Sequence, residues 1–270
     1  MHFFDSLVAI FSGRRDTPPR HDSLIPVFAR MAEASDKGQR QTNEDYVLVA
    51  PDMDLAIVAD GMGGHEAGEV ASHLASEVIR DTLAASRPTD LRQAEAAILA
   101  AMVAANGAVH AKNQANLATG RMAMGTTVAG VWRPDRDARH VLLFNIGDSR
   151  VYLFRDGRLS QVSRDHTLYQ NWLDGGERGP APDSHYLTRC IGVAAEVEPM
   201  VGLCQVMQGD ILLLCSDGLN AHVDDPTIGM VLGGGGDIST LCHSLVAHAL
   251  AGGGSDNISI IAVQWGLSDQ

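Results

Sequence analysis

The feature that most constrains this chain is an apolar run that ends abruptly at an aspartate. The stretch from Ile57 to His65 reads IVADGMGGH. This pattern predicts a buried strand that delivers Asp60 to a tight turn, where the glycines let the backbone approach a metal ion or a phosphate closely. From Ala67 onward, apolar residues recur at helical spacing, so the turn joins a core strand to an amphipathic helix. Asp-Gly after a strand is also typical of an ordinary hairpin, and the choice depends on partners elsewhere in the chain.

Composition describes a folded, acidic protein. With 270 residues, of which 45% are apolar, the chain can bury a sizeable core. Its formal net charge of −13 argues against a nucleic-acid partner and suits either solubility or a cluster of cation-binding carboxylates. The four cysteines form no CxxC pair, so we expect free, mostly buried thiols in a reducing compartment, the cytoplasm.

Residues 1–25 are expected to form an N-terminal extension or linker, and residues 267–270 a short tail. Phe3, Leu7 and Phe11 gather on one helical face, but no basic residue precedes them and no cleavage site follows, which argues against a secretory signal. Packing on the domain, docking to a partner or membrane surface, and disorder are the alternatives for this segment. We expect no apolar segment to reach the ~18 residues needed to cross a bilayer, which predicts a soluble protein.

Most of the chain shows the alternation and turn signals of antiparallel strands rather than a βαβ series. Strands are predicted at 27–34, 46–49, 124–132, 141–145, 150–154, 159–163, 200–206, 211–215 and 258–265. Helices are predicted from residue 67 and over 91–117, 168–173 and 238–250, with Asp90 as an N-cap. The strands at 141–145 and 150–154 are expected to be neighbours around Gly147-Asp148-Ser149. Residues 167–186 form a loop-like insertion rich in glycine and proline.

Carboxylates recur at the predicted strand ends and tight turns, where a shared sheet can gather them at one edge. They are Glu44, Asp45, Asp60, Asp148, Asp217 and Asp256. Hard oxygen ligands without cysteine or histidine select Mg²⁺, Mn²⁺ or Ca²⁺. Two such ions, ~3.5–4 Å apart, lower the pKa of a bridging water and clamp the oxygens of a phosphoryl group during its displacement. Arg40 shares a short loop with Glu44 and Asp45, so an anion and a cation can be held side by side.

Taken together, eight motifs resemble those of bacterial metal-dependent phosphatases of the type 2C (PPM) serine/threonine family. In order, they are Arg40-x-x-Asn43-Glu44-Asp45, Asp60-Gly61-Met62-Gly63-Gly64-His65, Gly125-Thr126-Thr127, Gly147-Asp148-Ser149-Arg150, Asp165-His166-Thr167, Leu187-Thr188-Arg189, Ser216-Asp217-Gly218 and Asp256-Asn257. The resemblance implies an α+β fold, a four-layer α-β-β-α sandwich of two antiparallel sheets flanked by helices, with a dinuclear metal site at one edge. It also implies a catalytic domain over residues 26–266, with residues 167–186 as a flap-like insertion.

The same resemblance implies roles for individual residues. Asp60 is expected to bridge two Mn²⁺ or Mg²⁺ ions, and the Gly61 carbonyl to ligate one of them. The other implied ligands are Asp217 and Asp256 for one ion, Asp45 and, through water, Glu44 for the other, and Asp148 with Asp217 for a more labile third ion.

Two further residues are implied in catalysis alongside Asp60. Arg40 resembles the arginine whose planar fork binds phosphate. His65 is a candidate general acid, because Met62 stands where animal members carry a histidine; a structural role is the alternative.

The implied activity is hydrolysis of phosphoserine and phosphothreonine on proteins by a metal-activated water, with a bacterial Ser/Thr kinase or its targets as the natural partner. Two alternatives are kept. One is a catalytically weak regulatory or phosphoprotein-binding module of the same fold, and the other is a hydrolase of small phosphoesters.

Overall fold

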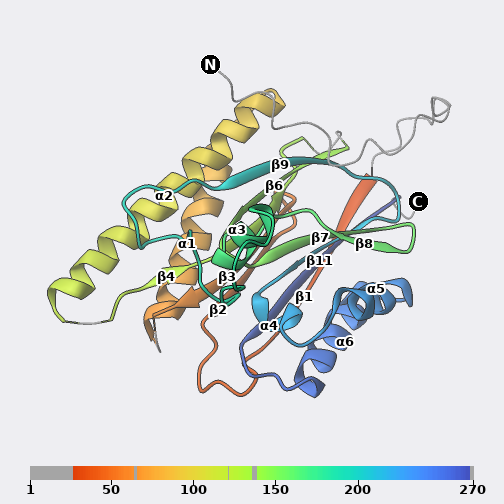
Figure 1. The fold of residues 1–270 in the computed structure, drawn as a ribbon. Coiled ribbons are helices and arrows are strands. Elements are labelled where there is room, and N and C mark those ends of the chain that lie inside the picture. The colour runs from red at the N-terminus through yellow and green to blue at the C-terminus, as the bar shows by residue number, and fades with distance from the viewer. Residues whose placement is uncertain (1–26, 64–65, 121, 136–138, 268–270) are drawn as a thin grey trace.

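Two antiparallel sheets form the centre of the molecule, seen in a computed structural model that describes residues 27–63, 66–120, 122–135 and 139–267 (Figure 1). The five-stranded sheet has the order β1 (Val27–Asp36), β11 (Ile258–Leu267), β10 (Ile211–Cys215), β7 (Arg150–Arg155) and β8 (Arg158–Gln161). The six-stranded sheet has the order β2 (Asp45–Ala50), β3 (Leu55–Met62), β5 (Val128–Trp132), β6 (His140–Ile146) and β9 (Met200–Gln205), and the short β4 (Gly125–Thr126) pairs with β3. The predictions for residues 1–25 lie outside the described residues.

Helices cover the outer face of each sheet (Figure 1). The long helices α1 (Glu66–Ala85) and α2 (Leu91–Ala118) pack together over the six-stranded sheet, and Asp90 caps α2 by accepting a hydrogen bond from Gln93 N, as predicted. The five-stranded sheet is covered by α4 (Asp217–Asn220), α5 (Asp225–Gly233) and α6 (Ile238–Ala251), while α3 (Leu168–Asp174) lies in the 167–186 insertion. The four-layer sandwich that the sequence implied is therefore confirmed.

Three apolar cores fill the three spaces between these four layers. In β3, Leu55, Ile57 and Ala59 face α1 and α2, whereas Ala56 and Val58 face the other sheet. Successive side chains of a strand point to opposite faces, and both faces of this strand are covered. The unbroken apolar run before Asp60 is the consequence of this double burial.

One predicted neighbour relation is wrong. The strands at 141–145 and 150–154 are not paired, because β6 pairs with β5 and β9, whereas β7 pairs with β10 and β8. The Gly147-Asp148-Ser149 turn therefore crosses from one sheet to the other. Gly147 has φ +100°, and a Cβ there would come within 2.5 Å of a Thr127 methyl, so only glycine fits the crossing. Strand periodicity marks where a strand is, but not the sheet to which it belongs.

Helix α2 corrects the expectation about apolar segments. Among the described residues it is the one helix with the length and mean hydropathy, 1.3, to cross a membrane by composition alone. Its Ile98, Met102 and Val109 are nevertheless fully buried in the core beneath it. The pattern is that of a long core helix. The four cysteines are free, and three of them are buried, as expected.

Candidate functional site

The two adjacent strands β2 and β3 bring the first pair of carboxylates together. Asp45 and Asp60 are directly opposite each other in the antiparallel register. Like charges in this position are destabilising. Burial raises the pKa of Asp45 to about 7. A hydrogen bond from Ser216 opposes this shift, and the negative charges of Asp217 and Asp256 add to it. Burial and the Asp45 charge raise the pKa of Asp60 well above its ordinary value. The pair is thus arranged for a cation rather than for two free negative charges.

The second pair comes from the facing sheet. Asp217 stands two residues after the end of β10, as the first residue of α4. Asp256 stands two residues before β11, the neighbour of β10 in that sheet. Burial, together with the Asp256 charge, raises the pKa of Asp217. Ser216 joins the two pairs, because its Oγ donates to Asp45 Oδ2 at 2.7 Å and accepts from the Ser259 N–H at 3.0 Å. Four predicted ligands from two sheets therefore meet at one edge.

Two oxygens of this cluster identify the kind of ligand that it suits. Asp45 Oδ1 and Asp217 Oδ1 are buried, and no described residue hydrogen-bonds to them. A buried carboxylate oxygen without a partner costs free energy that a cation recovers. An all-oxygen donor set fits a hard divalent ion such as Mn²⁺ or Mg²⁺. Among residues 27–63, 66–120, 122–135 and 139–267, however, no three acidic, histidine or cysteine side chains are gathered closely enough to hold an ion as they stand.

Arg40 lies beside the cluster and is paired with one of its carboxylates. Its Nη2 is 2.8 Å from Asp256 Oδ2, and the side chains of Arg40 and Asp256 are 57% and 34% exposed. The predicted phosphate ligand and a predicted metal ligand are thus paired with each other. An exposed ion pair of this kind is weak, so either partner can exchange it for a ligand.

Asn257 positions the loop that carries Arg40. Its Oδ1 accepts from the Glu44 N–H at 2.8 Å, and its Nδ2 donates to the carbonyls of Lys37 and Thr42 at 3.0 and 2.9 Å. Asn257 is only 6% exposed, so these bonds are shielded from water. The motif Asp256-Asn257 consequently combines a candidate ligand with the anchor of the Arg40 loop.

The backbone around Asp60 is held by two threonines. Asp60 N donates to Thr127 Oγ1 at 3.0 Å, and Asp60 O accepts from Thr126 Oγ1 and from Thr127 N, both at 2.9 Å. Thr127 Oγ1 also lies 2.6 Å from Ser149 Oγ. The Gly125-Thr126-Thr127 and Gly147-Asp148-Ser149-Arg150 motifs therefore fix the position of Asp60.

Asp148 and His166 lie at the crossing between the sheets. Burial, followed by the charges of Asp217 and Asp165, raises the pKa of Asp148 to about 7. His166 holds this crossing through its ring and its backbone. Its Nδ1 accepts a hydrogen bond from the Gly147 N–H at 3.2 Å, and the backbone N–H of His166 donates to the Gly147 carbonyl at 2.8 Å. Burial lowers the pKa of His166 to about 4, so the ring is a neutral acceptor.

The remaining predicted residues lie as follows. Gly61 pairs with Thr126 in β4, and its N–H donates to the Glu44 carbonyl at 3.1 Å. The Glu44 carboxylate lies against Gly68 in α1, where a Cβ would come within 2.0 Å of it. His65 lies outside the described residues.

His185 is a residue that the sequence patterns did not single out. It belongs to the 167–186 insertion, and its Nδ1 lies 3.9 Å from Asp217 Oδ2, with 71% of the side chain exposed. No motif or periodicity marks this position, because the contact is made only when the insertion folds over the sheet edge.

Proteins named as serine/threonine phosphatases are similar to this chain. The sequence matches the family described as "Protein phosphatase 2C" over residues 34–232. It is 36% identical over 242 residues to the serine/threonine protein phosphatase PstP of Mycobacterium tuberculosis, covering 88% of this chain but 45% of PstP. The chain thus spans about half the length of that relative. It is 33% identical over 251 residues to the serine/threonine phosphatase Stp of Listeria welshimeri, covering 86% of this chain and 94% of Stp.

Solved structures give the same result. The crystal structure of the PstP catalytic domain in complex with two manganese ions superposes with a TM-score of 0.77 at 36% identity, covering 89% of this chain and 99% of that one. PppA, a regulatory component of the type VI secretion system in Pseudomonas aeruginosa, superposes with a TM-score of 0.77 at 33% identity, covering 88% of this chain and 98% of that one.

Proposed function

Because the chain belongs to the protein phosphatase 2C family, we propose that it removes phosphate from phosphoserine and phosphothreonine residues of proteins. The observation that carries this proposal is the meeting of Asp45, Asp60, Asp217 and Asp256 from two sheets, beside Arg40. A purely structural edge has no reason to accumulate buried carboxylate oxygens without partners.

The carboxylates would hold two Mn²⁺ or Mg²⁺ ions, and Asp60 would be a ligand common to both. The Gly61 carbonyl, Asp217 and Asp256 would hold one ion, and Asp45, with Glu44 through water, would hold the other. Asp148 and Asp217 would serve a labile third ion. When bound, such ions activate a water molecule for attack and neutralise the charge of the phosphate. The two manganese ions in the PstP catalytic domain support a site for two divalent ions.

The chain's own groups orient the substrate. Arg40 exchanges Asp256 for two phosphate oxygens, since its guanidinium is exposed and its planar fork matches an oxyanion. Thr126 and Thr127 keep Asp60 in place while the charge of the cluster changes. The leaving alkoxide requires a proton, for which His65 and His185 are the two candidate donors.

The proposed unit is residues 26–266, acting in the cytoplasm on a bacterial Ser/Thr kinase or on its targets. A catalytically weak module of the same fold fits less well, because the candidate metal aspartates are all present. A hydrolase of small phosphoesters also fits less well, because the matched relatives are named as protein phosphatases.

Phosphate release from a phosphothreonine peptide tests the proposal. We expect turnover with Mn²⁺ or Mg²⁺, none with chelator, and a loss of several orders of magnitude in Asp60→Asn. Asp52→Asn, at an exposed turn, is the matched control and should retain activity. A folded, Mn²⁺-binding protein without turnover would overturn the enzymatic assignment, and preference for nucleotide substrates over the peptide would favour the small-phosphoester alternative.

A further inference from the structure

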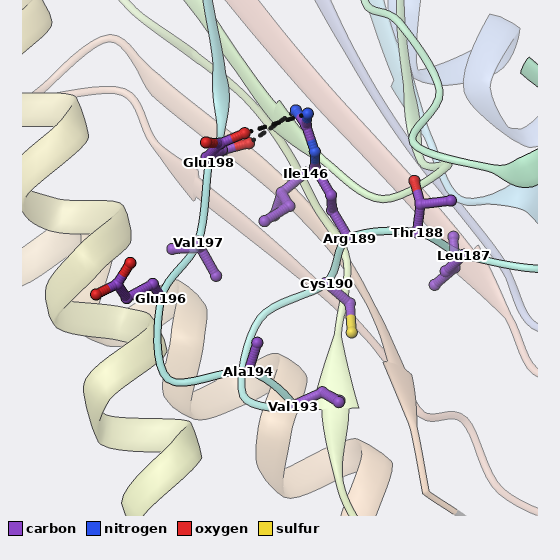
Figure 2. Close-up of a pocket in the computed structure, with 10 residues that line it drawn as sticks. All are labelled: Ile146, Leu187, Thr188, Arg189, Cys190, Val193, Ala194, Glu196, Val197 and Glu198. Atoms are coloured by element: carbon purple, nitrogen blue, oxygen red, sulfur yellow. Dashed lines mark hydrogen bonds and ion pairs between the residues drawn. The ribbon is translucent and has the colours of Figure 1, made fainter. Parts of the chain in front are cut away.

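A pocket of about 370 Å³ is lined by the segment that joins the 167–186 insertion to β9 and by one residue of β6 (Figure 2). Five aliphatic side chains line it: Ile146, Leu187, Val193, Ala194 and Val197. Figure 2 shows Arg189 reaching across from one segment to Glu198 on the facing one, where its Nη2 lies 3.2 Å from Glu198 Oε2. The pocket thus has an aliphatic lining and a charged rim.

The pocket wall is connected directly to the candidate site on two sides. On one side, Ile146 is two residues before Asp148. On the other side, Ile191, which follows the lining residue Cys190, exchanges backbone hydrogen bonds of 2.8 and 3.1 Å with Thr126, and the Thr126 hydroxyl donates to Asp60 O at 2.9 Å. The pocket and the carboxylate cluster therefore share the same supporting backbone.

The spacing between paired strands gives the approximate distance from the pocket segment to the carboxylate cluster. Ile191 bridges to Thr126 of β4, and Thr126 is opposite Gly61 of β3, so two strand spacings, about 10 Å, separate the backbone of Ile191 from that of Gly61, the residue after Asp60. An extended peptide covers about 3.3 Å per residue. A side chain within about three residues of a phosphorylated residue can therefore reach the pocket.

The side chains that line the pocket and its rim indicate which peptide residues it can bind. Val193 is 53% exposed, so part of this aliphatic surface is in contact with water and gains free energy when it is covered. Glu198, 84% exposed, and the exposed Glu196 place carboxylates at the rim, against one arginine. These charges favour a basic residue beside the aliphatic one.

We propose that this pocket is a substrate subsite that takes an aliphatic side chain near the phosphorylated residue of a basic phosphopeptide. The inference rests on the proposed phosphatase function, of which it specifies the substrate class.

The test uses three phosphothreonine peptides and p-nitrophenyl phosphate, a small substrate that cannot reach the pocket. The first peptide carries Leu-Arg within three residues of the phosphothreonine, the second replaces the leucine by serine, and the third replaces the arginine by glutamate. Burial of a leucine side chain predicts a kcat/KM about tenfold or more higher for the first peptide than for the second, and the rim predicts a lower value for the third.

Val193→Asp should remove the preference for leucine while kcat/KM for p-nitrophenyl phosphate stays within about twofold. Met230→Asp, at a 65% exposed methionine on α5, is the matched control and should change neither. No leucine preference in the intact protein, or an equal loss on all four substrates in Val193→Asp, would overturn the subsite.

Failure of the proposed function is detected separately. Binding of the same labelled peptides to Asp60→Asn is measured by fluorescence anisotropy, which requires no turnover. Tighter binding of the leucine peptide, lost in the Asp60→Asn/Val193→Asp double variant, would support the subsite even in a protein that hydrolyses nothing. Equal binding of the leucine and serine peptides would refute it.

Discussion

Replacing Asp60 by asparagine should stabilise the metal-free protein, although it removes the metal-dependent activity. Asp60 lies opposite Asp45 across two paired strands and shares the sheet edge with Asp217 and Asp256. Without a cation, this cluster concentrates negative charge at a poorly solvated position. An asparagine keeps the size of the side chain and the backbone hydrogen bonds to Thr126 and Thr127, but it removes one charge.

The size of the effect follows from the burial of Asp60, which, followed by the charge of Asp45, raises the pKa of Asp60 well above its ordinary value; the similarly buried Asp45 gives the scale. A pKa of about 7 instead of 3.8 places the charged form of Asp45 about 4 kcal/mol higher than in a solvated carboxyl at neutral pH. Burial, the largest cause, and the charges of Asp217 and Asp256 account for this cost and remain in the variant, whereas the buried charge of Asp60 itself is removed. We therefore expect a gain of about 1–3 kcal/mol in the free energy of unfolding, comparable with other replacements of buried charge.

Urea unfolding in chelator, followed by tryptophan fluorescence, measures this gain. A parallel thermal scan should show about 2–4 °C for each kcal/mol. With Mn²⁺ the order should reverse, because the wild type gains binding free energy that the variant has lost. Since a raised carboxyl pKa costs stability only as the pH rises above the unfolded value, the advantage of Asp60→Asn should be largest above pH 7 and fade toward pH 4.

Asp52→Asn, at an exposed turn, controls for a general effect of net charge and should leave both curves unchanged. The reasoning is refuted if Asp60→Asn is less stable than the wild type in chelator at pH 7.5. It is also refuted if both proteins gain equally from Mn²⁺, because Asp60 would then lie outside the metal site.

Three further outcomes are expected. Burial and neighbouring charges raise the pKa values of Asp45 and Asp148 to about 7, so both groups are largely protonated at pH 6. Mn²⁺ binding at pH 6 should therefore release protons, measured with an indicator dye, and the Mn²⁺ affinity should increase as the pH rises to 8. An affinity that does not change with pH would contradict this. The pKa of His166 is lowered to about 4 in the folded protein, whereas its ordinary value is 6.5. Between these two values the unfolded chain protonates His166 and the folded protein does not, so His166 lowers the free energy of unfolding as the pH falls below 6.5. His166→Asn, whose amide oxygen can accept from Gly147, should therefore gain about 2 kcal/mol relative to the wild type between pH 7.5 and pH 5 in urea unfolding, and a constant difference would argue against a neutral ring. Arg40→Lys keeps the positive charge beside Asp256 but loses the planar guanidinium that can bind two phosphate oxygens. We expect kcat/KM on a phosphopeptide to fall about 10–100-fold, with little change in the Mn²⁺ affinity measured by calorimetry. Unchanged turnover would show that Arg40 does not bind the phosphate.

The candidate site was predictable from the sequence to the extent that its residues are marked locally. Asp60, Asp217 and Asp256 each stand where an apolar strand meets glycine or polar turn residues, and such transitions are visible in a single window of sequence. The convergence of these three on one edge could be expected because strands of one sandwich end together. The side chains that contact these aspartates could not be predicted from local patterns. The ion pair of Arg40 with Asp256, for example, joins residues 216 positions apart.

By itself, the sequence determined the strands, the long helices and the order of the acidic turns, because periodicity and glycine placement act over a few residues. Only the tertiary structure decided that β6 and β7 belong to different sheets, that Asn257 anchors the Arg40 loop, and that His185 approaches Asp217. It alone formed the pocket beside Ile146 and Val193. These features depend on which distant segments pack together, and that choice follows from the burial of whole layers rather than from any local pattern.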